Sequence, residues 1–127
     1  LISNSLQKYK LNYNDNHLSW HYHLFIGLKH KFELEKKSIN NILEIGTDKG
    51  LFTSFLSDVF SESDIYSIDL NESDQTFLDY FNRRDPSVMK AHLKERSINL
   101  KNDNIIFKEM NSSEIVNQFK EDTFDLD

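Results

Sequence analysis

The chain has 127 residues, enough for one domain with a real core and too few for two. The absence of cysteine excludes disulfide scaffolds, cysteine-ligated zinc and thiol nucleophiles, and it fits a cytoplasmic location. A net charge of -6 without a long run of Lys and Arg argues against general nucleic-acid binding, and no apolar run is long enough to span a membrane.

Residues 1–39 are predicted to form a helical lead-in to the domain that follows. A helix is expected from His17 onward because apolar residues recur at three- and four-residue spacing, namely Leu18, Tyr22, Phe25, Leu28 and Phe32. Trp20 is expected in the core. His17 and His21 are four residues apart, as a helical metal pair would be, but no third ligand is evident and no metal site is predicted.

Residues 40–127 are expected to form a unit in which strands alternate with helices. Short apolar runs rich in branched residues predict four strands, at "NILEIG", "IYSIDL", "NIIFKEM" and, where the sequence stops, "TFDLD". This alternation favours right-handed crossovers and a parallel sheet, so the predicted fold class is α/β, doubly wound. Because the fourth strand is only beginning at Asp127, we expect a fragment of a longer protein, with an exposed sheet edge suited to homo-oligomer formation.

The helical segments of this unit carry start signals. "LFTSFLSDVF" is predicted to place its apolar residues, Leu51 among them, on one helical face. Asp85 is the expected cap of a helix that begins at Pro86, a residue that suits the first helical position. The stretch "KAHLKERS" in that helix is interpreted as an exposed face, and Ser112 or Ser113 is the expected cap of the last helix.

The loop after the first strand, "EIGTDKG", holds two of the three glycines in the chain. A dinucleotide fingerprint, G-x-G-x-x-G, counted from Gly46 requires glycine where Asp48 and Leu51 stand. A P-loop requires four residues between its glycines and then a lysine, whereas three residues precede Gly50 here and Lys49 comes before it. Neither phosphate-binding pattern is therefore present.

Charge around this loop favours a ligand without phosphate. Glu44 and Asp48 flank the loop, and two carboxylates repel a doubly charged pyrophosphate. S-adenosylmethionine has a cationic amino group and sulfonium, a single small carboxylate, and ribose hydroxyls that an acid can accept. Asp69 ends the second strand and is placed to accept from both ribose hydroxyls. The sequence therefore predicts a site for S-adenosylmethionine.

Several motifs resemble those of the class I S-adenosylmethionine-dependent methyltransferases. "ILEIGTDKG" resembles their motif I in the form that lacks the middle glycine, and "IYSIDL" resembles their acidic ribose-binding strand end. "NIIFKEMNSSEI" resembles the third strand and adenine loop, with Met110 and Asn111 where the family has Gly-Asp, and "FDLD" resembles the start of the fourth strand. The resemblance runs from about Asn40 to the last residue and implies a Rossmann-like fold.

Carried over residue by residue, the resemblance implies a cofactor site made by Glu44, Gly46, Thr47, Asp48, Gly50, Asp69, Leu70, Asn111 and Ser112. In this assignment Glu44 supports the loop, and the glycines lie beside the methionine and ribose. Asp69 binds the ribose, Leu70 packs on the adenine, and Asn111 contacts the adenine edge. Met110 in place of glycine changes the shape expected for the adenine pocket.

The function implied is methyl transfer from S-adenosylmethionine, by in-line displacement, to a small-molecule or glycan-type acceptor, with S-adenosylhomocysteine as product. The family places most acceptor-binding residues after the fourth strand, so no catalytic residue is named, and metal dependence stays open. Trp20 is an alternative wall for the acceptor pocket. Arg83 and Arg84 close a helix C-terminus or, alternatively, bind an acidic acceptor. A non-catalytic binding module, favoured by Met110 and Asn111, and another nucleotide-binding α/β protein remain as alternative functions.

Overall fold

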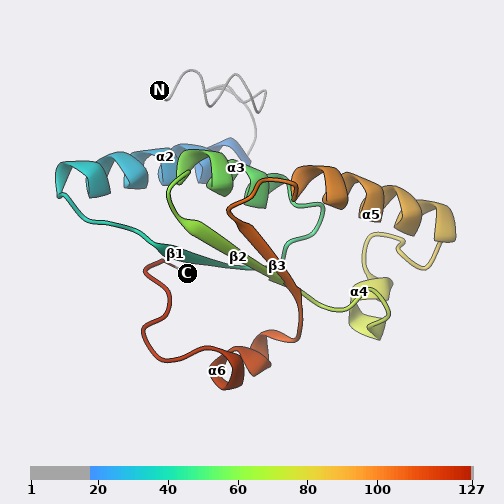
Figure 1. The fold of residues 1–127 in the computed structure, drawn as a ribbon. Helices are drawn as coiled ribbons and strands as arrows, with labels where there is room; N and C mark the ends of the chain where they lie inside the picture. The colour runs from blue at the N-terminus through green and yellow to red at the C-terminus, as the bar shows by residue number, and fades with distance from the viewer. Residues whose placement is uncertain (1–17, 127) are drawn as a thin grey trace.

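The structure, a computed structural model, describes residues 18–126. Figure 1 shows its elements, which in chain order are α2 (Leu18–Leu34), β1 (Asn41–Ile45), α3 (Leu51–Val59), β2 (Asp64–Asp69), α4 (Gln75–Asp79), α5 (Pro86–Asn99), β3 (Ile105–Glu109), the 3-10 turn η1 (Ser112–Glu114) and α6 (Ile115–Gln118). Strands and helices alternate as the sequence predicts, so the α/β class is confirmed. Within the described residues no helix has both the length and the apolar character needed to cross a membrane.

The sheet is parallel, with the strand order β1-β2-β3. The predicted fourth strand is not formed within the described residues, where "TFDLD" contributes an isolated parallel bridge between Leu126 and Ile42. Two backbone hydrogen bonds hold it: Leu43 N–H donates to the Leu126 carbonyl and Asp125 N–H donates to that of Asn41, both at 2.8 Å. The bridge lies on the side of β1 away from β2, so the order of chain segments across the sheet reverses at β1.

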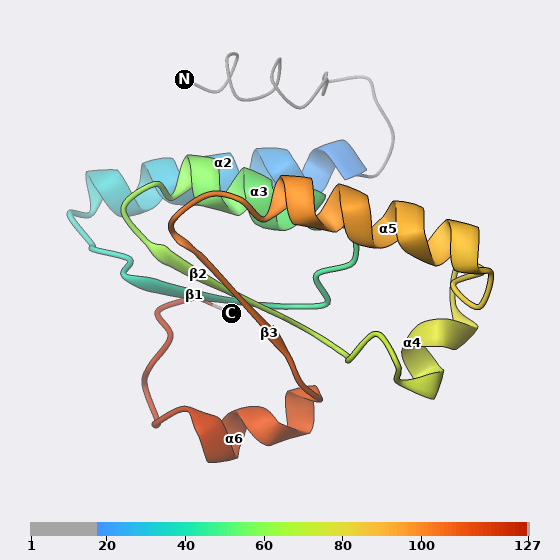
Figure 2. The same ribbon diagram turned by 45° about the vertical axis from the view of Figure 1, so that its right-hand side comes forward.

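The helices divide between the two faces of the sheet. Helices α2, α3 and α5 cover one face, and η1 with α6 lies against the other (Figures 1 and 2). Successive β1 side chains point to opposite faces of the sheet. Ile42 belongs to the core under the helices, and Leu43 belongs to the smaller core with Ile68 and Met110. The core under the helices consists of Tyr22, Ile26, Ile42, Phe55, Leu56, Phe60 and Ile65.

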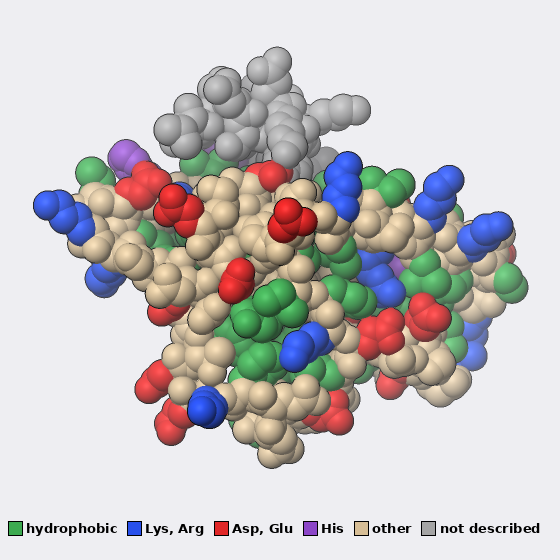
Figure 3. Space-filling view, viewed as in Figure 1, with side chains coloured by type: hydrophobic (Ala, Val, Ile, Leu, Met, Phe, Trp, Pro, Cys, Tyr) green, Lys and Arg blue, Asp and Glu red, His purple; other side chains and the backbone are tan. Residues whose placement is uncertain are grey.

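Strand β3 forms one edge of the sheet, and no strand within residues 18–126 pairs with its outer side. Figure 3 shows apolar side chains gathered between the helical layer and α6 on this side of the molecule. The exposed edge expected from the sequence is that of the incomplete fourth strand, not of β3, and it stays a prediction, as does its use in homo-oligomer formation.

Two expectations for the helix faces are wrong. Trp20 is 74% exposed, whereas Tyr22 and Ile26 reach the core. Successive helical residues are about 100° apart, so a residue two positions before Tyr22 points away from the face that Tyr22 buries. Leu51, at the start of α3, is also exposed, while Phe55 and Leu56 in the same helix are buried.

Helix α5 begins as predicted but buries part of the face that was expected to be exposed. The Asp85 carboxylate accepts the Ser87 N–H at 2.8 Å, and Pro86 is the first helical residue. His92 and Arg96, one turn apart, are nevertheless buried. The Arg96 guanidinium lies 4.6 Å from the ring centroid of Phe107, so its stem and planar group cover the sheet although the residue is charged.

Candidate functional site

The loops that follow the three strands meet at one edge of the sheet. Because the strands are parallel, their carboxyl ends lie together. Gly46, after β1, donates its N–H to the Ile68 carbonyl at 2.8 Å, and Met110, after β3, donates its N–H to the Asp69 carbonyl at the same distance. This end of the sheet brings together the predicted site residues of all three loops.

The glycine loop contains three left-handed residues in a tight turn. Gly46, Asp48 and Gly50 have φ of 94°, 50° and 76°, and Gly50 N–H donates to the Thr47 carbonyl at 2.8 Å. A Cβ added at Gly46 would meet no atom within 4 Å, whereas one at Gly50 would lie 2.8 Å from Leu100 Cδ2. Gly46 therefore leaves open space beside the loop, and Gly50 is required by packing against the end of α5 as well as by its backbone.

The Asp69 carboxylate is oriented by main-chain groups. Its Oδ2 accepts the Asp48 N–H and its Oδ1 accepts the Leu70 N–H, each at 2.8 Å. A carboxylate oxygen can accept more than one hydrogen bond, and Asp69 is only partly buried, so both oxygens retain capacity for hydroxyl donors. Leu70, also partly buried, follows directly and lies beside this position.

Glu44 lies beneath the loop in a network of buried hydroxyl groups. Its Oε2 accepts from Thr53 Oγ1 at 2.5 Å and from Ser67 Oγ at 2.6 Å. Thr47 Oγ1 is 2.7 Å from Ser67 Oγ, and because the Ser67 proton goes to Glu44, the Thr47 hydroxyl is the donor. Burial raises the pKa of Glu44 above its ordinary 4.5, and the hydroxyl donors oppose that shift.

This network joins β1, α3 and β2 to the glycine loop and uses two residues that the motif comparison did not select. Thr53 is in α3 and Ser67 in β2, and both are fully buried. A sequence feature that could have identified Thr53 and Ser67 is that each is a small hydroxyl residue at an inward position of an otherwise apolar run. Thr47, assigned to the cofactor side, points its side chain inward to this network, so its main chain is the part that borders the edge.

The charge of Asp48 is compensated within the chain. Arg83 Nη2 lies 2.8 Å from Asp48 Oδ1, and Arg83 Nη1 donates to the Phe77 carbonyl of α4 at 3.1 Å. His92 Nδ1 is 3.8 Å from the same Asp48 oxygen. Burial, and next the Arg83 guanidinium, lower the pKa of His92 below 6.5. The sequence suggests that the Glu44 and Asp48 carboxylates repel phosphate, but the charge of Asp48 is already balanced by Arg83.

Both arginines contact α4, which agrees with the expectation that they close a helix end. Arg84 Nε lies 2.7 Å from Asp79 Oδ1, and Asp79 is the last residue of α4. Arg83 reaches a carbonyl in that helix and extends to the glycine loop. The link between Arg83 and Asp48 is a long-range contact that the sequence pattern does not indicate.

The loop after β3 differs from the expected capping pattern. The cap is Asn111 rather than Ser112 or Ser113, because Asn111 Oδ1 accepts the Ser113 N–H at 3.0 Å. Glu114 Oε2 accepts the Asn111 N–H at 3.2 Å and completes a capping box. Asn111 and Ser112 are exposed at the site edge, whereas Met110 is buried against Leu43 and Ile68.

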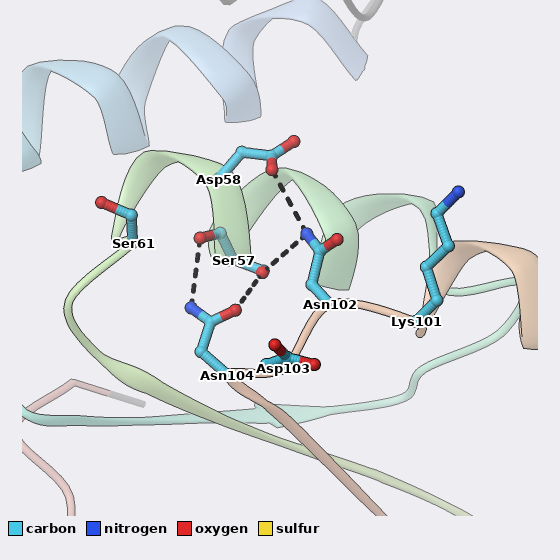
Figure 4. A pocket seen from close by; sticks show the side chains of 7 residues that line it. All are labelled: Ser57, Asp58, Ser61, Lys101, Asn102, Asp103 and Asn104. Atoms are coloured by element: carbon cyan, nitrogen blue, oxygen red, sulfur yellow. Dashed lines mark hydrogen bonds between the residues drawn. The ribbon is translucent and has the colours of Figure 1, made fainter.

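One pocket in the described residues lies beside this site, and another lies at the opposite, amino end of β3. One, of about 400 Å³, borders the glycine loop and α5 and is lined by Asp48, Lys49, Phe81, Arg83, Val88, Ala91, His92 and Glu95. The other, of about 480 Å³, lies between the end of α3 and the start of β3 (Figure 4). There Asn104 Nδ2 donates to the carbonyls of Ser57 and Ser63, at 3.2 and 2.9 Å, which gives this polar pocket a structural explanation.

No metal-binding group is found in residues 18–126, where no three His, Asp or Glu side chains are arranged to hold an ion. His17 lies outside the described residues, and His21 packs its ring near those of Phe25 and Phe52. Comparisons of the chain with family models, curated proteins and solved structures found no match.

Proposed function

We propose that this chain binds S-adenosylmethionine and takes part in methyl transfer from it. The observation that carries the proposal is the hydrogen bond between the glycine-loop N–H of Asp48 and the carboxylate of Asp69. It joins the two motifs at the carboxyl ends of neighbouring parallel strands, where the segment order reverses. Open α/β sheets bind their ligands at that place.

The chain's own groups suit the parts of this cofactor. Asp69, held by two main-chain donors, accepts from the ribose hydroxyls. The open space beside Gly46 admits the methionine portion close to the backbone. Leu70 and the exposed Asn111–Ser112 segment flank the adenine.

S-adenosylmethionine supplies a methyl group on a sulfonium that is already activated for displacement. The residues described here would bind and orient it, and orientation alone can lower the barrier by several kcal/mol. None of the site residues is placed as a base for the acceptor. The proposed acceptor class is a small molecule or glycan.

One observation favours a second candidate, a binding module without methyl transfer. Met110, which stands where the family has glycine, is buried against Leu43 and Ile68. Asn111, in the place of the family's acid, uses its side-chain oxygen to cap η1. Both residues have structural roles that do not require a cofactor.

Calorimetric titration with S-adenosylhomocysteine, NAD and ATP tests the proposal. We expect S-adenosylhomocysteine to bind in the micromolar range and the other two to bind at least tenfold more weakly, a difference of about 1.4 kcal/mol. Asp69→Ala should abolish binding, and Asp69→Asn, which keeps the shape of the side chain, should weaken it. Asp64→Ala is the matched control, because Asp64 is exposed at the opposite end of the same strand.

The outcomes separate the alternatives. Binding of S-adenosylhomocysteine by a chain that transfers no methyl group to any acceptor supports the module. Preference for NAD or ATP supports another nucleotide-binding protein. Lack of binding by a chain whose circular dichroism spectrum shows it to be folded refutes the cofactor proposal.

A further inference from the structure

Arg83 is a buried cation that links α4 to the glycine loop. The residue is 7% exposed, and its Cζ lies 4.0 Å from the ring centroid of Phe77. One end of the guanidinium donates to the Phe77 carbonyl and the other to the Asp48 carboxylate. These contacts fix the planar group on three sides, so Asp48 meets a donor whose position is already set.

Asp48 is held at both its side chain and its main chain. Its φ of 50° lies in the left-handed region, which Asp tolerates better than most residues at a cost that other contacts must offset. Its carboxylate accepts from Arg83, and its N–H donates to Asp69 Oδ2. The ion pair therefore stabilises the backbone conformation that directs this N–H onto Asp69.

The segment that presents Arg83 is itself held in an uncommon conformation. Phe81 and Asn82 have φ of 53° and 58°, and Arg83 N–H donates to the Tyr80 carbonyl at 3.2 Å. Two successive left-handed residues with neither a glycine cost of the order of 1 kcal/mol each. The turn places the Phe81 ring 5.2 Å from the Arg83 guanidinium carbon. Left-handed backbone therefore occurs at Asp48 and just before Arg83, and the ion pair between these residues is the contact that stabilises both conformations.

We infer that Arg83 is a positioning residue for ribose recognition, acting through Asp48 to hold the glycine loop against Asp69. This inference rests on the proposed function for its ligand, and on the described contacts for its mechanism. It explains why an acid stands at position 48, because a glycine would adopt the backbone without offering a partner to Arg83. The loop has a second anchor, since Asn99 Nδ2 donates to the Lys49 carbonyl at 2.9 Å, so losing the pair should loosen the loop without releasing it.

A double-mutant cycle with Asp48→Asn and Arg83→Met tests the inference. Asp48→Asn is the safer change, because the side chain is 59% exposed and Asn also tolerates the left-handed region. Each single variant should speed hydrogen exchange of the residue 48 amide, corrected for its intrinsic rate, about fivefold and weaken S-adenosylhomocysteine binding by a similar factor. The double variant should equal a single variant in both measurements, and Arg84→Met, the control, should change neither.

A ligand comparison separates positioning from general support of the fold. Asp48→Asn should weaken adenosine and leave 2′,3′-dideoxyadenosine unchanged, because the second ligand lacks the hydroxyls that Asp69 accepts. Unchanged exchange in Asp48→Asn, or effects that multiply in the double variant, would overturn the inference. If the wild-type chain binds no S-adenosylhomocysteine, the proposed function falls, and the exchange cycle alone decides whether the pair orders the loop. If Arg83→Met fails to fold, Arg83→Gln, which also removes the charge, replaces it in the cycle.

Discussion

Replacing Gly50 by alanine perturbs the glycine loop where backbone and packing demands coincide. Gly50 has φ +76°, and a Cβ there would lie 2.8 Å from Leu100 Cδ2 and 3.1 Å from Leu100 Cγ. The first distance is shorter than real Cβ contacts allow, so Leu100 must move. The perturbation therefore combines left-handed strain with displacement of a side chain that follows α5.

The expected cost can be worked out from these two terms. A left-handed alanine costs about 1 kcal/mol, and local overpacking adds about 1 to 2 kcal/mol, so Gly50→Ala should lower the free energy of unfolding by about 2 to 3 kcal/mol. Gly46→Ala has the strain of φ +94° but no atom within 4 Å, and should cost about 1 kcal/mol. Gly27→Ala, inside α2 with nothing within 4 Å, should stabilise by up to about 1 kcal/mol.

Urea unfolding followed by far-ultraviolet circular dichroism measures all three variants against the wild-type chain. The expected order of stability is Gly27→Ala, wild type, Gly46→Ala, Gly50→Ala, with similar dependence on urea concentration. Equal losses for Gly46→Ala and Gly50→Ala would refute the role of Leu100. A gain in stability for Gly50→Ala would refute the left-handed conformation at that position.

Two further changes test the buried polar groups. Burial raises the pKa of Glu44 above 4.5, so the folded chain keeps a proton at pH values where the unfolded chain releases it. The resulting contribution to stability is lost as pH rises from about 4.5 through the folded pKa. Glu44→Gln should flatten that decline in urea midpoints measured between pH 4.5 and 8. Asn104→Ala removes the donor to the carbonyls of Ser57 and Ser63 and should cost about 2 kcal/mol in thermal or urea unfolding. Asp103→Ala, exposed in the same pocket, should cost less than 0.5 kcal/mol.

The strands and the glycine loop could be predicted because their signals are local. Branched apolar runs end at Gly46 and Asp69, and parallel topology then brings those residues to one edge without further information. The end of the chain shows the limit of that reasoning. "TFDLD" has a strand pattern, yet within the described residues the two backbone hydrogen bonds give a single bridge at Leu126.

The side chains that surround the loop could not be predicted from pattern. The sequence places His92 and Arg96 on an exposed face because both are polar residues. In the structure His92 packs against the Phe77 ring and Arg96 against the Phe107 ring, contacts that hydropathy does not include. Arg83 and Asp48 are 35 positions apart, and their contact depends on a turn through Phe81. Phe81 is left-handed although it is not glycine, so the sequence gives no sign of this turn. Local sequence therefore predicts which elements form the edge, and tertiary contacts determine the charge there.

That charge now depends chiefly on Asp69. Arg83 compensates Asp48, and Glu44 lies beneath the loop with its Oε2 accepting from Thr53 and Ser67, so the repulsion of phosphate expected from these two acids is weaker than the sequence suggests. Asp69 differs because both its oxygens accept main-chain N–H groups, an arrangement that suits a carboxylate and directs its remaining lone pairs outward. Hydroxyl donors fit that group and a pyrophosphate does not. The preference for S-adenosylhomocysteine over NAD and ATP should therefore shrink in Asp69→Asn, where one acceptor oxygen and the charge are lost together.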